Sequence, residues 1–145
     1  MIAVDTNILV AALRSEYEHH ERAAARVREL AEGSSPWALP WPCVHEFLAA
    51  VTNPRIFREP LSSQHAADAI DALLESPTAR LIAEGPGYWP ILRQLVTETK
   101  VAGPRIHDAR IAAVCLAHGV TELWTADRDF SRFPALRIRN PCVAK

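Results

Sequence analysis

The sequence predicts an α/β protein in which a parallel sheet is covered by helices on both faces. Short apolar segments typical of buried strands alternate with longer segments that repeat apolar residues at helical spacing. The chain has 145 residues and no repeat, linker or low-complexity segment, so we expect a single domain over residues 1–145.

The elements follow one another in alternation along the chain. We expect strands over residues 1–4, 37–41, 79–85, 121–127 and, at the end, 136–139. We expect helices from about Asn7 and over residues 16–33, 42–51, 62–76, 88–100 and 105–120. Prolines bracket residues 53–60, which predicts a loop.

Composition excludes several classes of protein. No segment is long and apolar enough for a membrane span, and the polar residues near the start exclude a signal peptide. The three cysteines, Cys43, Cys115 and Cys142, are far apart and lack the CxxC spacing of a zinc site or redox pair. A net charge of −1 gives no global signal for nucleic acid. We therefore expect a cytoplasmic protein with reduced thiols.

Four carboxylates stand at ends of elements or in apolar surroundings. Asp5 ends the first strand, Asp127 ends a later one, Asp108 lies at a helix start and Glu46 lies within an apolar helix. Parallel α/β sheets place ligand sites at the carboxyl ends of their strands. Asp5 and Asp127 therefore stand at positions where such sites form.

Each carboxylate also has an ordinary structural explanation. Asp5 is a good helix cap, and Asp108 suits the dipole of a first helical turn. Glu46 points away from its apolar neighbours on a helical wheel, which favours solvent exposure, and Asp127 fits a turn. Taken singly, none of them establishes a site.

If the four converge, their charges require compensation. Carboxylates that share a site cannot all remain ionised alone, and a divalent cation supplies the missing charge. Oxygen ligands suit Mg²⁺, with Mn²⁺ as a possible substitute, and the sequence has no convincing His and Cys cluster for zinc. The chemistry indicated is phosphodiester hydrolysis.

Four motifs in order carry a resemblance to a known family. VDTNILV, HEFLAAV, HDARIAAVCLAHGV and LWTADRDF resemble the PIN-domain ribonucleases, specifically the VapC toxins of type II toxin-antitoxin systems, over nearly the whole chain. The resemblance implies a three-layer α/β/α PIN-like fold with a central parallel sheet. It also implies an acidic pocket of Asp5, Glu46, Asp108 and Asp127, with Asp129 as an outer member.

The same resemblance implies an activity and partners. These are Mg²⁺-dependent cleavage of RNA, with structured targets such as tRNA or ribosomal RNA loops, a homodimer, and a small VapB-like antitoxin that blocks the pocket. Under this hypothesis Asp5 and Asp108 are the principal metal ligands, and Asp127 ligates directly or through water. Glu46 would hold a metal-bound water and help to deprotonate it.

Other residues have supporting roles under the same hypothesis. Thr6, Asn7 and Thr125 are candidates to orient the carboxylates or to donate to phosphate oxygens, although Thr125 equally suits an ordinary strand. The candidates for contact with RNA phosphates are Arg105, Arg110, Arg128 and Arg132, for which ordinary solvated charges are the alternative. Residues 53–60 could reach the substrate or simply connect two helices.

Three rival functions remain open. The six histidines could supply a metal-free acid and base pair, although nothing in their spacing pairs them. An Asp-centred phosphotransfer domain lacks a suitably placed Lys, since only Lys100 and Lys145 exist. A non-catalytic RNA-binding or interaction module with a PIN-like fold is the third, and it would not need all four carboxylates.

Overall fold

A computed structural model of the chain describes residues 1–143. Its strands are β1 Ile2–Val4, β2 Trp37–Pro40, β3 Ala79–Ile82, β4 Glu122–Trp124 and β5 Arg137–Arg139. Its α-helices are α1 Thr6–Leu13, α2 His20–Glu32, α3 Trp41–Val51, α4 Ser63–Leu74, α5 Tyr88–Thr99 and α6 Ile106–Ala117. Two 3-10 helices are η1 Gly103–Arg105 and η2 Arg128–Arg132.

The five strands form one parallel sheet in the order β3-β2-β1-β4-β5. The first strand is central, and its residue Ile2 lies opposite Trp37 of β2 and Glu122 of β4. Because every strand runs the same way, all carboxyl ends meet at one edge of the sheet. The predicted α/β class with a central parallel sheet is confirmed.

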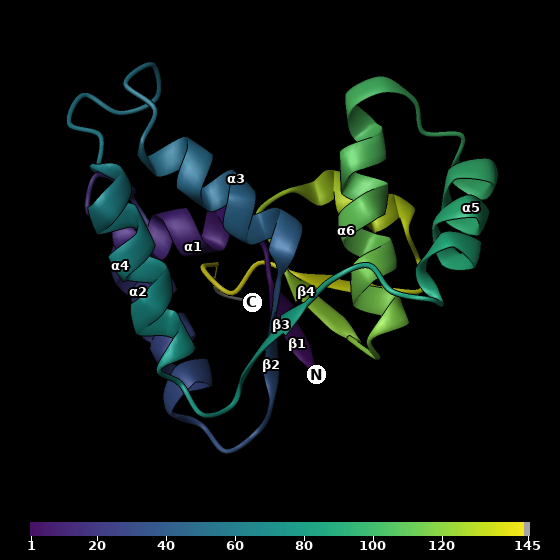
Figure 1. The fold of residues 1–145 in the computed structure, drawn as a ribbon, viewed down its shortest axis with the longest axis horizontal. Coiled ribbons are helices and arrows are strands. Elements are labelled where there is room, and N and C mark those ends of the chain that lie inside the picture. The colour runs from purple at the N-terminus through teal and green to yellow at the C-terminus, as the bar shows by residue number, and fades with distance from the viewer. Residues whose placement is uncertain (144–145) are drawn as a thin grey trace.

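Helices cover both faces of this sheet, which gives the three predicted layers. In Figure 1, α1 to α4 lie on one side of the sheet, and α5 and α6 lie on the other. Successive side chains of β1 point to opposite faces of the sheet. Ala3 belongs to the core beneath α5 and α6, and Val4 belongs to the core beneath α1 to α4.

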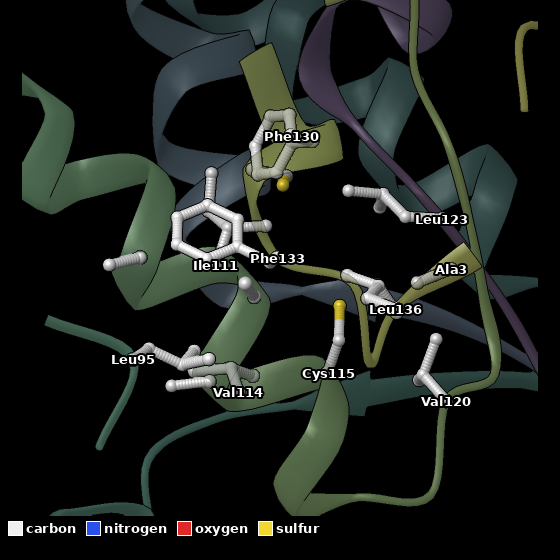
Figure 2. Close-up of a cluster of buried hydrophobic side chains, with 14 of the residues drawn as sticks. Ala3, Leu95, Ile111, Val114, Cys115, Val120, Leu123, Phe130, Phe133 and Leu136 are labelled. Atoms are coloured by element: carbon white, nitrogen blue, oxygen red, sulfur yellow. The ribbon is translucent and has the colours of Figure 1, made fainter. Parts of the chain in front are cut away.

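The core on the α6 side also anchors the C-terminal part of the chain. Figure 2 shows Phe130 and Phe133, which follow β4, beside Ile111 of α6. Both phenylalanine side chains are almost fully buried. Their burial fixes η2, which directly follows Asp127, against the carboxyl edge of the sheet.

One predicted helix begins later than the sequence pattern indicated. The helix expected over residues 16–33 begins at His20, and the residues before it form turns. Contacts of the turn explain the difference, because Arg14 pairs with Glu16 at 2.6 Å and donates to the Glu59 carbonyl oxygen at 2.8 Å, and the His20 ring contacts the Ala11 carbonyl oxygen at 2.8 Å. The pattern also missed η2.

Other boundaries agree with the sequence signals. Pro42 lies in the first turn of α3, and the Ser62 side chain caps α4 by accepting from the His65 backbone N–H. Gly119 follows α6 with a φ of 74°, a conformation that favours glycine. Within residues 1–143 we find no helix with both the length and the apolarity needed to cross a bilayer.

Candidate active site

The four carboxylates predicted from the sequence line one cavity. This cavity of about 320 Å³ lies at the carboxyl edge of the sheet and is lined by Asp5, Glu46, Asp108 and Asp127, among others. They come from four separate segments: the end of β1, the middle of α3, the first turn of α6 and the turn after β4. We call it the carboxylate cavity.

Asp5 is the buried member of the set, with 4% of its surface exposed. Its Oδ1 accepts from the Thr6 backbone N–H at 2.8 Å, which caps α1. Its Oδ2 accepts from the Thr125 hydroxyl at 2.7 Å and from the Asn7 side-chain amide at 3.2 Å. These donors come from both sides of the carboxylate and fix its orientation.

A thiol contributes a further donor to Asp5. The Sγ of Cys43 lies 3.5 Å from Asp5 Oδ1. Burial, and next the charge of Asp5, raise the pKa of the Cys43 thiol, so the thiol keeps its proton and donates. The sequence analysis did not find this contact. The signal was the spacing between Cys43 and Glu46, which puts them one turn apart on α3.

The environment of Asp5 raises the pKa of its carboxyl group. Burial is the largest cause and raises the pKa, and the nearby charge of Glu46 raises it further. Hydrogen bonds from Thr125, Thr6 and Cys43 lower the pKa but do not cancel the effect of burial. Asp5 therefore holds its negative charge at an energetic cost in the protein alone.

This cost predicts a pH dependence of stability. The Asp5 carboxyl has a higher pKa in the folded protein than in the unfolded chain, so the folded protein binds its proton more tightly. The stability that this proton contributes is complete below the unfolded pKa and is lost as the pH rises through the folded pKa. We expect the free energy of unfolding of wild type, relative to Asp5→Asn, to fall as the pH rises from about 3 to about 7. Urea unfolding of both proteins in EDTA measures this difference. A relative stability that rises with pH would contradict the assignment.

The other three carboxylates are more accessible. Glu46 is exposed, as the helical wheel predicted, and its Oε2 accepts from the Thr6 hydroxyl at 3.0 Å. Asp127 caps η2 by accepting from the Asp129 backbone N–H at 2.9 Å. The ordinary explanations for Asp5 and Asp127, a cap and a turn, are thus correct, and both residues line the cavity as well.

Arg105 lies between two carboxylates at the edge of this site. Its guanidinium contacts Asp108 at 3.2 Å and Asp129 at 2.5 Å. The guanidinium of Arg132 lies 3.9 Å from the Asp129 carboxylate, and its Nε donates to the Asp129 backbone carbonyl oxygen at 3.1 Å. Asp129 is absent from the lining of the carboxylate cavity, in keeping with an outer position.

The remaining arginine candidates differ in their surroundings. Arg110 forms an ion pair with Glu84 at 2.5 Å, and the hydrogen bond from Arg110 is the main reason that the pKa of Glu84 is lowered. It does not line the carboxylate cavity. Arg128 is exposed and forms no ion pair within the part of the chain that the structure describes.

The structure also places the residues of the alternative hypotheses. No histidine among residues 1–143 lines the carboxylate cavity. The loop over residues 53–60 does reach the cavity, through Ile56.

Six apolar residues of the lining were not among the residues predicted from the sequence, and two of these, Tyr17 and Ile56, are exposed. Tyr17 fell within a segment expected to be helical, so its position at a turn was hidden. Ile56 lies in a loop whose path depends on tertiary contacts. No three His, Cys, Asp or Glu side chains in the described range already stand close enough to hold a metal ion.

Comparisons with known proteins agree with this geometry. The PIN domain family profile matches residues 2–136. Ribonuclease VapC43 of Mycobacterium tuberculosis is 40% identical over 141 residues, which cover 97% of this chain and 95% of that protein.

Solved structures share the fold at low sequence identity. VapBC2 of Rickettsia felis, bound to a DNA fragment from its promoter, matches with a TM-score of 0.70 at 20% identity, covering 96% of this chain and 98% of that one. VapC20 of Mycobacterium tuberculosis, described as a sarcin-ricin loop cleaving toxin, matches with a TM-score of 0.65 at 20% identity, covering 96% and 99%. Both the family profile and the sequence identity show that this chain belongs to the PIN-domain family, among the VapC ribonucleases.

Proposed function

We propose that the carboxylate cavity is the hydrolytic centre of a toxin endoribonuclease that cuts RNA phosphodiester bonds with the help of Mg²⁺. The observation that carries this proposal is the meeting of Asp5, Glu46, Asp108 and Asp127 around one cavity. The caps and turns that these residues form separately do not require the four side chains to gather around one cavity.

The donor set fits a hard divalent cation. All four side chains offer oxygen ligands, which suit Mg²⁺ or Mn²⁺. Asp5, Asp108 and Asp127 would hold the ion, and the raised pKa of Asp5 shows that this carboxylate gains from a compensating positive charge. No three such ligands converge within residues 1–143, and Mg²⁺ is commonly held by one or two carboxylates together with water and phosphate oxygens. A bound divalent cation would lower the pKa of water and neutralise charge on the phosphoryl group.

Other side chains would orient Asp5, accept a proton and contact the RNA. Thr6, Asn7 and Thr125 hold Asp5 in place through hydrogen bonds. Glu46 is exposed and has one recorded donor, the Thr6 hydroxyl, so it can accept the proton of the attacking water. Arg128, exposed beside Asp127, is placed to contact a phosphate of the RNA backbone.

The proposal extends to partners on the strength of the relatives. The matching structures from Rickettsia felis and Haemophilus influenzae are VapBC assemblies, which supports a VapB-like antitoxin as partner of this chain. VapC20 is described as cleaving the sarcin-ricin loop, which supports a structured RNA such as ribosomal RNA or tRNA as substrate. A homodimer and a cytoplasmic location complete the proposal. A non-catalytic RNA-binding module is the weaker alternative, because all four carboxylates are retained.

Metal binding tests the proposal without relying on cleavage. We expect Mn²⁺, titrated by calorimetry into purified protein free of any partner, to bind wild type and to bind Asp5→Asn far more weakly. Asp68→Asn is the matched control, because Asp68 is exposed on α4 and lines no part of the carboxylate cavity. Equal Mn²⁺ binding by wild type and Asp5→Asn would remove Asp5 from the metal site.

A further inference from the structure

Two apolar side chains form a wall that the carboxylate cavity shares with a second cavity. Tyr17 lies in the turns between α1 and α2, and Ile56 lies in the loop between α3 and α4. Both line the carboxylate cavity and also an adjoining cavity of about 440 Å³, whose other lining residues are Glu16, Glu18, Phe57 and Arg58. We call this adjoining space the side cavity.

Both side chains are accessible to a ligand. Tyr17 is 41% exposed and Ile56 is 54% exposed. Single exposed apolar residues are common on protein surfaces and need no explanation. Here, two of them from separate loops line the same two adjoining cavities, so a ligand held by the carboxylates would lie in a cavity that both side chains line.

The contacts of one buried arginine, Arg14, hold the Tyr17 ring in place. Arg14 is 8% exposed, and its guanidinium lies 4.4 Å from the centroid of the Phe57 ring. The same guanidinium contacts Glu16 at 2.6 Å and the Glu59 carbonyl oxygen at 2.8 Å, which ties the two loops together. The Tyr17 ring packs on Phe57 with centroids 6.2 Å apart at 55°. The wall is therefore preorganised.

Charge decides which part of a nucleotide the wall accepts. Arg14 pairs with Glu16, but Glu18 and the four carboxylates of the carboxylate cavity leave an excess of negative charge around Tyr17, which disfavours a backbone phosphate at the wall. A nucleobase is neutral and has a flat face that stacks on an aromatic ring. Its N–H groups can donate hydrogen bonds to carboxylates. Arg58 also lines the side cavity, and its charge would attract a phosphate of the next nucleotide.

We propose that Tyr17 and Ile56 form a nucleobase subsite, in which an unpaired base next to the cleaved bond stacks on Tyr17 and contacts Ile56. Arg14 acts as a positioning residue for this wall. The proposal rests on the proposed function, because it takes the carboxylate cavity as the place of cleavage. It adds a determinant of which nucleotides are presented there.

Binding of short RNA tests the subsite separately from cleavage. Fluorescently labelled single-stranded RNAs of each base are titrated with the full chain in EDTA and again in Ca²⁺, and anisotropy is recorded. We expect Tyr17→Ala to weaken binding about 5- to 100-fold, the range for loss of one stacked base. Tyr17→Phe keeps the ring and should change binding less than about twofold. Trp89→Ala, which removes a more exposed ring lining neither cavity, should leave binding unchanged.

Mapping of cut sites gives a second readout. In a pool of RNAs with randomised sequence, Tyr17→Ala should raise KM more than it lowers kcat and should relax the base preference beside the cut. Arg14→Lys keeps the positive charge but loses the planar guanidinium. It should raise KM as well, by a smaller factor than Tyr17→Ala.

The outcomes separate the subsite from the proposed function. If wild type cuts RNA and Tyr17→Ala binds and cuts like wild type, the subsite is wrong and the proposed function stands. Loss of a protein partner with unchanged RNA binding would also overturn the subsite, by assigning the wall to that partner. If wild type does not cut RNA, the proposed function fails, and the anisotropy titrations still decide whether Tyr17 contacts a base.

Discussion

Asp5→Asn is expected to lower the rate of RNA cleavage at least about 100-fold while the fold remains intact. Residues that only support a metal ligand cost about 10- to 100-fold when mutated, so loss of a direct ligand should reach or exceed that range. Asparagine keeps the volume of Asp5 and removes the charge that burial makes costly. Cleavage kinetics at saturating Mg²⁺ and thermal denaturation measure the two effects.

The stability measurement makes this prediction specific. Because burial raises the pKa of Asp5, removing its charge should offset part of the cost of losing one acceptor for Thr125 and Asn7, so Asp5→Asn should still show a cooperative melting transition at neutral pH. Asp68→Asn should match wild type in both activity and stability. An Asp5→Asn protein that is inactive because it has unfolded would show no such transition, and one with wild-type activity would exclude Asp5 from the mechanism.

Asp108→Asn is expected to lower cleavage to a similar extent, at least about 100-fold, because it removes a second of the proposed direct ligands. Asp108 lies in the first turn of α6, where its charge is also favourable to the helix dipole. Loss of that charge should lower the free energy of unfolding by about 0.3–1 kcal/mol, which leaves the protein folded. Single-turnover cleavage and urea unfolding measure both quantities.

Asp129→Asn is a matched control for Asp108→Asn. Both carboxylates contact the guanidinium of Arg105, but only Asp108 lines the carboxylate cavity. If lining the cavity is what matters, Asp129→Asn should cost less than about tenfold. Equal losses in the two variants would instead assign the effect to the ion pairs of Arg105.

The sequence predicts the fold and the acidic site well because both depend on local rules. Alternation of strands and helices indicates a parallel sheet, and a parallel sheet brings the ends of its strands to one edge. That rule puts Asp5 and Asp127 at the same edge of the sheet, and the pairing of β1 with β4 then makes their strands neighbours. Thr6 and Asn7 follow because they adjoin Asp5 in the chain, and they contact it in the structure.

For Glu46, the helical wheel predicts the exposure of the side chain but not its place in the site. The helical wheel places it away from the core, and it is exposed. The wheel cannot show that α3 passes the carboxyl edge of the sheet, where an exposed side chain lines the cavity. Only the tertiary packing of α3 converts exposure into membership of the site.

Contacts between distant segments could not be predicted from one sequence. The ion pair of Arg110 with Glu84 depends on how α6 lies beside the segment after β3. The position of Tyr17 depends on Arg14, which ends α1 and directs the chain into turns where the sequence pattern favoured helix. Side chains placed by such contacts belong to the nucleobase subsite, which is why that subsite was found only in the structure.

The measurement that tests the account most directly is cleavage of total bacterial RNA by the purified protein, freed of any partner, with the cut ends mapped by sequencing. Reactions contain Mg²⁺ or Mn²⁺, with EDTA and Asp5→Asn as parallel controls. We predict discrete cuts that disappear in both controls, which would establish a metal-dependent endoribonuclease and identify its target. Absence of cuts, or cuts that survive both controls, would contradict the assignment of the carboxylate cavity as the hydrolytic centre.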